Sequence, residues 1–312
     1  MGRLAVFETS HFTWIGAQLV WVAIKPVMNK PEKSSLLSEL PPPDLDVAAA
    51  ASSNVSALER GISVLRCFDE MSSLLSNQQL SQLTGIPKPT MTRLTATLVN
   101  LGLLRQDAVR ESYMLGPGVM PLARAFLANL DFRATARPLM QEFSETNEGT
   151  SVYLGLHDDL SMVIVEACRA RSSMISARID VGSRTPISNS ALGRAFLSVC
   201  DADERESIFA RLQSDDPTRW RLLAPGLMKA LALAKHDGFC MSMGEWHREI
   251  NSVSVGFKDA EGEILSLNCG GATYMFPEER LRWDIAPKLH LLASTIAERI
   301  GGFAPPVLGG SR

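Results

Sequence analysis

Residues 83–104 read LTGIPKPTMTRLTATLVNLGLL, and two prolines bracket a lysine inside an otherwise helical pattern. Pro87 disfavours helical geometry at Ile86, whereas Pro89 suits the first turn of a helix, because the amide that it lacks would have no partner there. Gly85 suits the end of a preceding helix, since glycine adopts the left-handed conformation without a Cβ clash. The stretch therefore predicts a short helix, a tight turn and a second helix.

The helix after the turn is predicted to run from Pro89 to Leu101 with two unlike faces. Its apolar face is made by Met91, Leu94, Leu98 and Leu101. Its other face and its entrance contain no carboxylate and are made by Lys88, Thr90, Thr92, Arg93, Ala96, Thr97 and Asn100. Short hydroxyl side chains, a guanidinium and free helix amides can approach phosphates and base edges in a DNA major groove. The alternative is a neutral surface with Thr95 partly buried, and this helix alone favours neither.

The residues upstream predict two more helices. The first has Ser56 as its N-cap, and its expected inward face is made by Leu58, Ile62, Leu65 and Phe68. The second runs from Asn77 to Thr84 and is expected to turn Leu80 and Leu83 inward.

The residues downstream predict a hairpin. Residues 103–106 and 112–116 read as two short strands around a turn that contains Arg110. Helix, helix, turn, helix and hairpin is the order of a winged helix-turn-helix domain, whose third helix enters the groove and whose wing touches the DNA backbone. The predicted DNA-binding residues are Lys88, Thr90, Thr92, Arg93, Thr97 and Arg110.

The charge of this region limits what one copy can do. Residues 54–120 contain six Lys and Arg against five Asp and Glu, a balance of +1. So weakly charged a module should bind DNA poorly alone, whereas two copies on two half-sites would double the phosphate contacts. We therefore expect a homodimer or homotetramer.

The whole chain has the composition of a folded two-domain protein. It has 312 residues, 46% of them apolar and 21% charged, with a net charge of −3. Its five cysteines form no CxxC pair of the kind that zinc and redox sites use, so free thiols in a reducing cytoplasm are expected.

The first 53 residues differ from the rest and are predicted to be a disordered or extra extension. Residues 12–24 form an apolar run of 13 residues, shorter than the roughly 20 that cross a bilayer. No basic region precedes the run and no small-residue cleavage site follows it, so we expect neither a signal peptide nor a membrane partner.

The second half of the chain predicts an α+β domain with one antiparallel sheet. After a linker helix within residues 117–130 and a helix from Asp131, the expected strands are Ser151–His157, Ser161–Cys168, Met174–Ile179, Ser252–Lys258 and Glu263–Cys269. The expected helices are Ser188–Cys200, Asp203–Leu212, Pro225–Lys235 and Pro277–Ile300. The predicted domains are therefore 54–116, 117–130 and 131–302, followed by a tail at 303–312.

These motifs, in this order, resemble the IclR family of bacterial transcriptional regulators. The resemblance is carried by ALERGISVLRCFDE and LSNQQLSQLTGIPKPTMTRLTATLVNLGLL in the first half and by RATARPLMQEFSETNEGT, VGSRTPISNSALGRAFLS, HDGFCMSMGEWHREINSVSVGFKDAEGEIL and LNCGGATYMF in the second. It covers about residues 54–301. It implies that a helix joins the winged domain to a profilin- or GAF-like ligand-binding domain.

The resemblance also implies an effector site at the start of the helix in NSALGRAF. The residues that it designates are Ala191, Leu192, Ser242, Ser252, Asn268 and Gly270, with Trp246 as a lid. Free amides and the helix dipole at this helix start suit a carboxylate. Close packing around Gly193 is a second explanation for the small residues and is compatible with the first. Where many members have acidic residues and an Arg-Cys pair, this chain has Ser242, Met243, Asn251 and Ser252, so the charge of the effector stays open.

Catalysis is not indicated. The histidines and cysteines lie in no G-x-S-x-G, HExxH or phosphate-loop motif. Glu245 and His247 would share one face of a strand and could reach a metal ion together, but two ligands do not make a site. We therefore expect no enzyme activity, no metal and no cofactor.

The sequence therefore predicts a DNA-binding transcriptional regulator controlled by a small organic or aromatic acid. The alternative is a small-molecule sensor whose winged domain contacts other proteins.

Overall fold

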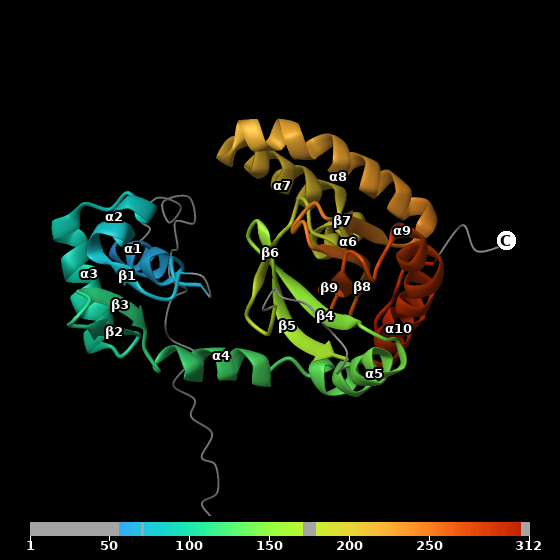
Figure 1. The fold of residues 1–312 in the computed structure, drawn as a ribbon, viewed down its shortest axis with the longest axis horizontal. Helices are drawn as coiled ribbons and strands as arrows, with labels where there is room; N and C mark the ends of the chain where they lie inside the picture. The colour runs from blue at the N-terminus through green and yellow to red at the C-terminus, as the bar shows by residue number, and fades with distance from the viewer. Residues whose placement is uncertain (1–55, 70–71, 171–178, 307–312) are drawn as a thin grey trace, which may run out of the picture. The chain divides into compact units, whose positions relative to one another are not determined.

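The structure of the chain is a computed structural model that describes residues 56–69, 72–170 and 179–306 (Figure 1). The predicted N-terminal extension, most of the predicted strand Met174–Ile179 and the end of the predicted tail lie outside these residues. Two parts follow one another along the chain, and each is described by itself.

The first part has the predicted order of elements. It consists of α1 (Ser56–Leu65), β1 (Leu75–Ser76), α2 (Asn77–Thr84), α3 (Lys88–Asn100), β2 (Leu104–Asp107) and β3 (Ser112–Leu115). The three strands form an antiparallel sheet in the order β1-β3-β2, and only β1 was absent from the prediction.

Local capping explains where α2 and α3 begin and end. Ser76 caps α2 in a reciprocal capping box with Gln79, and Gly85 ends it with φ +70°. Pro87 precedes α3, Pro89 occupies its first turn, and Gly102 follows its end with φ +71°. The predicted turn between the two helices is confirmed.

The core of this part is smaller than helical periodicity predicts. Its buried side chains include Val64, Leu80, Met91, Leu98, Leu104 and Tyr113. Leu83 and Leu101, predicted to face inward, are 63% and 65% exposed, and Leu58 and Ile62 are exposed as well. Those four predictions are wrong, because short helices around so small a core bury only the centre of each apolar stripe.

Two helices lead into the second part. These are α4 (Val119–Ala128), within the predicted linker, and α5 (Phe132–Thr146), which continues through Pro138 as one helix. A six-stranded antiparallel sheet follows in the order β6-β5-β4-β9-β8-β7. Its strands are β4 (Ser151–Asp158), β5 (Ser161–Arg169), β6 (Arg184–Pro186), β7 (Cys240–Met243), β8 (Ile250–Lys258) and β9 (Ile264–Ala272). The short edge strands β6 and β7 were not predicted.

The remaining helices are α6 (Ala191–Val199), α7 (Ala202–Asp215), α8 (Pro217–Asp237), α9 (Glu278–Arg280) and α10 (Ala286–Arg299), with a π-helical turn η2 at Leu281–Ile285. The predicted start of α8 at Pro225 is wrong: Asp216 caps the helix by accepting from the amides of Thr218 and Arg219. The predicted final helix is interrupted by η2, next to Pro287, which has no amide to donate to the preceding turn.

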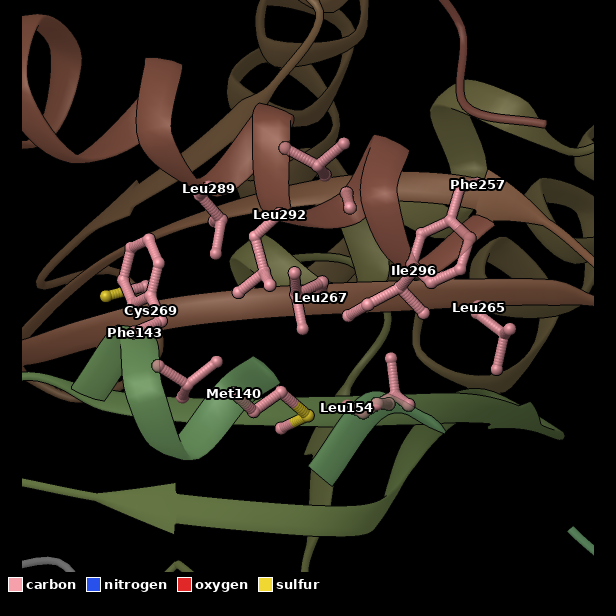
Figure 2. Packing of buried hydrophobic residues seen from close by; sticks show 14 of the residues in the cluster. Met140, Phe143, Leu154, Phe257, Leu265, Leu267, Cys269, Leu289, Leu292 and Ile296 are labelled. Atoms are coloured by element: carbon pink, nitrogen blue, oxygen red, sulfur yellow. The ribbon is translucent and has the colours of Figure 1, made fainter. Parts of the chain in front are cut away.

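The two faces of the sheet are covered by different helices. Figure 2 shows Met140 and Phe143 of α5, and Leu289, Leu292 and Ile296 of α10, packed with Leu154, Leu265 and Leu267 of the sheet. The other face packs against α6, with Leu192, Phe196 and Leu197 in its core. Burial of these side chains is the main stabilising term for the domain.

Glycines set how closely α6 approaches its neighbours. A Cβ added at Gly256 of β8 would lie 2.4 Å from the carbonyl oxygen of Ala195, and one added at Gly193 of α6 would lie 2.2 Å from that of Ile187. The helix therefore lies against the sheet and the preceding segment at backbone contact distance, and this brings its first residues over β4 and β9.

Candidate functional site

The predicted DNA-binding residues of α3 share its exposed side. Lys88, Thr92, Arg93 and Thr97 are exposed, Thr90 is half-buried, and Thr95 is fully buried. The hydroxyl of Thr95 donates to the carbonyl oxygen of Met91, so this threonine belongs to the interior, as the neutral alternative supposed for it.

The threonine hydroxyls on the exposed face are used within the helix. Thr92 donates to the carbonyl oxygen of Lys88, and Thr97 donates to that of Arg93, each at 3.0 Å. Their hydroxyl protons are therefore engaged, and they present methyl groups and acceptor lone pairs instead. The cationic donors on this face are Lys88 and Arg93, neither of which has an ion-pair partner among the described residues.

Arg110 lies in the turn of the hairpin. Its guanidinium pairs with Asp107 at 3.5 Å, while the Asp107 carboxylate accepts from the amides of Val109 and Arg110 at 3.0 Å. The carboxylate therefore shapes the turn and also reduces the net charge that Arg110 presents.

A second group of predicted residues surrounds one cavity, called here the inner cavity. Six of the seven predicted effector residues line it, namely Ala191, Leu192, Trp246, Ser252, Asn268 and Gly270. The other lining residues are Tyr153, Ile164, Ile179, Thr185, Ser190 and Ile250. The first turn of α6, the α6 face of β4, β5, β8 and β9, and the residues beside β7 thus meet around a single space.

The start of α6 gives this cavity a polar end. Ser190 caps the helix by accepting from the amide of Gly193 at 3.0 Å, and its hydroxyl donates to the carbonyl oxygen of Pro186 at 2.6 Å. As the first two residues of the helix, Ala191 and Leu192 carry amides for which no preceding helical turn offers a carbonyl. These amides and the positive end of the helix dipole favour an anion.

The sheet contributes polar side chains to the same space. Tyr153 of β4 lies opposite Asn268 of β9 in the ladder, and Asn268 accepts from the hydroxyl of Ser254 at 2.8 Å. The Tyr153 hydroxyl is buried without a hydrogen bond of ordinary geometry among the described residues. Burial raises the pKa of Tyr153, while the nearby Ser151 and Arg169 lower it.

Ser242 is the one predicted effector residue that does not line the inner cavity, whereas Trp246 lines it from a loop. Ser242 lies in β7, outside the cavity lining, and its hydroxyl donates to the backbone carbonyl of Asn189 at 2.8 Å. Trp246 is half-buried in the turn at residues 244–249, called here the Trp246 loop, which joins β7 to β8.

The prediction that Glu245 and His247 share one face of a strand is wrong. Glu245 and His247 do not lie on a strand, and the Glu245 carboxylate pairs with Arg194. Across residues 56–69, 72–170 and 179–306, no group of three or more His, Cys, Asp and Glu side chains could hold a metal ion.

Four buried cysteines remain protonated at neutral pH. Burial raises the pKa of Cys168 and Cys200 to about 11 and that of Cys240 to about 12, and it raises that of Cys269 as well. A buried thiol in this state is a weak nucleophile.

The inner cavity is small. Its volume is about 20 Å³, enough for a single water molecule. An outer cavity of about 300 Å³ lies beside it, with Thr185 in the lining of both, and is bordered by Leu212, Trp220, Arg184 and Arg219 together with Asp215 and Asp216.

Sequence reasoning missed five residues of the inner cavity: Tyr153, Ile164, Ile179, Thr185 and Ile250. Strand alternation identifies which residues share a face, but only the register of β4 against β9 places Tyr153 beside Asn268. Ser190 lies within the quoted motif NSALGRAF, at the predicted start of the helix.

Comparison with known proteins matches both parts of the chain. Residues 57–108 match the IclR helix-turn-helix domain, and residues 124–298 match the bacterial transcriptional regulator IclR C-terminal domain. The chain is 31% identical over 256 residues to the HTH-type transcriptional regulator TsaQ1/TsaQ2 of Comamonas testosteroni, covering 81% of this chain and 91% of that protein.

Solved structures give the same result. An IclR family transcriptional regulator from Brucella abortus is 38% identical, with a TM-score of 0.73 over 82% of this chain and 97% of that one. An IclR homologue from Microbacterium hydrocarbonoxydans, complexed with 4-hydroxybenzoate, is 18% identical and shares the fold, with a TM-score of 0.60 over 78% of this chain and 99% of that one.

Fold and matches together define a bacterial transcriptional regulator with an N-terminal helix-turn-helix domain and a C-terminal effector-binding domain. The chain belongs to the IclR family of such regulators. The predicted family, α+β fold class and regulatory function are confirmed. Within the described ranges, no helix has both the length and the apolar character needed to cross a membrane.

Proposed function

We propose that the inner cavity binds a small organic acid, with aromatic acids as the first candidates, and that this effector controls how a homodimer or homotetramer of the chain holds operator DNA in the cytoplasm. The observation that carries the proposal is the meeting of six sequence-designated residues with the free amides at the start of α6 around one cavity.

The chemistry of the lining supports this class of ligand. The amides of Ala191 and Leu192 suit a carboxylate, and Ile164, Ile250 and Trp246 provide apolar surface for a ring. The hydroxyls of Tyr153 and Ser252 can bond a polar substituent on that ring. That a distant family member is complexed with 4-hydroxybenzoate adds support for the same class.

A matched pair of buried serines tests the site. Ser252 lines the cavity, whereas Ser266 lies on neighbouring β9 outside the lining, and its hydroxyl has no hydrogen-bond partner among the described residues. Ser252→Ala is expected to weaken binding of the best acid by about tenfold, as for one lost hydrogen bond, while Ser266→Ala leaves it unchanged. Calorimetric titration measures both, after a thermal-shift screen with 4-hydroxybenzoate, benzoate and short aliphatic acids. The proposed effector class fails if none of these acids raises the melting temperature.

Helix α4 supports the dimer. It is apolar, yet none of its ten residues is buried, and Met120, Leu122 and Phe126 are at least half exposed. An apolar linker helix left in water is a typical contact for a second copy.

Charged residues on α4 should therefore separate the copies. Leu122→Glu with Phe126→Glu is expected to shift sedimentation toward the monomer and to weaken operator binding, because two half-sites would no longer be held together. Leu291→Glu introduces a carboxylate at a similarly exposed leucine of α10 and is the control, to be compared with Leu122→Glu alone. A doubly substituted protein that still sediments as the wild type does would contradict α4 as the interface.

Contacts from the cavity to this helix offer a route for control. Ile164 lines the cavity on β5, and Glu166 of the same strand is fully buried between Arg133 (3.0 Å) and Arg137 (2.9 Å) of α5. Arg133 also donates to the carbonyl oxygen of Leu127 in α4 at 3.3 Å. A shift of β5 on ligand binding would thus reach the linker through the Glu166–Arg133 ion pair.

A further inference from the structure

We propose that Arg194 is a positioning residue that holds the Trp246 loop closed over the inner cavity through Glu245, so that release of this pair controls entry and exit of the effector. The inference rests on the proposed function in one respect, that the inner cavity receives the effector.

One buried guanidinium joins four segments. Arg194 lies in α6 and is 4% exposed. Its Nη1 donates to the carbonyl oxygen of Met241 in β7 at 2.8 Å, and its Nε donates to that of Ser188 before α6 at 3.3 Å. The same Nη1 pairs with Oε2 of Glu245 in the Trp246 loop. A planar guanidinium with several fixed donors suits such a junction, whereas the ammonium of a lysine does not.

The backbone of the loop is held at the same residue. Asn189 Nδ2 donates to the carbonyl oxygen of Glu245 at 2.9 Å, and the carbonyl oxygen of Asn189 accepts from Ser242 Oγ at 2.8 Å. Glu245 is therefore attached to the start of α6 through both its side chain and its backbone. The next residue, Trp246, lines the cavity and packs against the core on this face.

The closed state must open for any organic ligand. The cavity holds about 20 Å³, whereas small-molecule sites measure about 300–1,000 Å³, so a wall has to move. Strands β4, β5, β8 and β9 are held by ladder hydrogen bonds on both sides, whereas the Trp246 loop is a turn between β7 and β8 at one edge of the sheet. Its side-chain contacts to the start of α6 can break without opening a strand ladder, so this loop is the wall that we expect to move.

The two partners of the Arg194–Glu245 ion pair differ in burial, which allows the pair to break and form again. The Glu245 side chain is 41% exposed and can move into water, whereas Arg194 stays buried and keeps the carbonyl oxygens of Met241 and Ser188 as acceptors. When the pair breaks, the guanidinium loses its counter-ion but keeps two hydrogen-bond acceptors. Hydration of the exposed Glu245 carboxylate offsets part of the attraction that is lost when the pair opens.

The first test needs no ligand. Glu245→Ala is expected to expose Trp246, so that acrylamide quenching of its fluorescence rises. The signal of Trp246 is obtained by subtracting the quenching of the same protein with Trp246→Phe, because the chain contains five tryptophans. Arg248→Ala in the same loop and Glu261→Ala, an exposed carboxylate in the β8–β9 turn, are the controls and should quench as the wild type does.

The second test measures rates, with 4-hydroxybenzoate as the probe in stopped-flow fluorescence. Because the loop must open for both entry and exit, Glu245→Ala is expected to raise the association and dissociation rates about tenfold each, equivalent to about 1.4 kcal/mol, and to change Kd less than about threefold. Arg194→Lys keeps the positive charge but cannot reach all three acceptors, and it should show the same increase in both rates.

The two experiments test the Arg194–Glu245 pair, called here the latch, separately from the effector site. If Glu245→Ala leaves the quenching of Trp246 unchanged, the latch is contradicted. It is also contradicted if 4-hydroxybenzoate binds but its association and dissociation rates are unchanged. A loss of affinity without a change in the association rate also overturns it, since it would make Glu245 a ligand contact. If the probe does not bind the wild type, the proposed effector class fails while the quenching experiment still decides the latch.

Discussion

Replacing Arg93 with alanine is expected to lower operator affinity by about 2 kcal/mol for each protomer, or about 30-fold for one half-site and nearly a thousandfold for two. Arg93 is exposed on α3, and the other charged residue of this helix is Lys88. The nearby threonines use their hydroxyl protons inside the helix, so the guanidinium carries much of the charge-assisted donation to DNA.

Salt dependence identifies what Arg93 contacts. Binding is measured by fluorescence anisotropy at several salt concentrations, with the DNA upstream of the protein's own gene. A duplex of scrambled sequence is measured for comparison. If Arg93 contacts a phosphate, Arg93→Lys retains most of the affinity and Arg93→Ala flattens the salt slope by about one per contact. If it contacts a base, Arg93→Lys loses the preference for the operator over the scrambled duplex.

The control removes the same charge elsewhere. Arg299→Ala, at the exposed end of α10, lowers the net charge equally and is expected to leave both affinity and salt slope unchanged. An Arg93→Ala protein that binds as tightly as this control would remove α3 as the recognition helix.

Replacing Gly193 with alanine is expected to destabilise the effector domain by about 3 kcal/mol and to lower its melting temperature by about 6–12 °C. The added Cβ would lie 2.2 Å from the carbonyl oxygen and 2.3 Å from the Cα of Ile187. These are backbone atoms of a fully buried residue, so no side chain can rotate away to make room. The first turn of α6 must shift, and acid binding at its amides should be lost with it.

Gly226 provides the matched control. It also lies inside a helix, α8, but a Cβ there would meet only the ends of the Arg194 and Glu245 side chains, at 3.6 and 3.8 Å. Gly226→Ala should therefore be neutral or stabilise the domain by up to about 1 kcal/mol, since alanine favours helix. Urea unfolding of both variants gives the comparison, and equal stability of the two would contradict close packing at Gly193.

The helix-turn-helix region was the most predictable part of the fold. Gly85, Pro87, Pro89 and Gly102 act on the backbone within one or two residues, so α2 and α3 begin and end within about a residue of their predicted bounds. Burial was less predictable, because Leu83 and Leu101 continue the helical spacing but find no neighbouring element to pack against.

The effector domain was predictable in its longer strands and less so in its edges. The strands β4, β5, β8 and β9 are long and apolar, whereas β6 and β7 are three and four residues long and carry too little pattern to be recognised. The start of α8 was missed because Pro225 resembles a first-turn proline, whereas the helix begins after its cap Asp216 and continues through Pro225.

The sequence by itself determined the winged helix-turn-helix order and, through its motifs, the family and six residues that meet around one cavity. Those inferences rest on local backbone effects and on short motifs, which act over a few residues. Only the tertiary structure decided that Tyr153 and Thr185 join the cavity, that Ser242 does not, and that Glu245 pairs with Arg194. The physical reason is that these relations depend on strand register and helix placement, which bring together residues 50 or more positions apart.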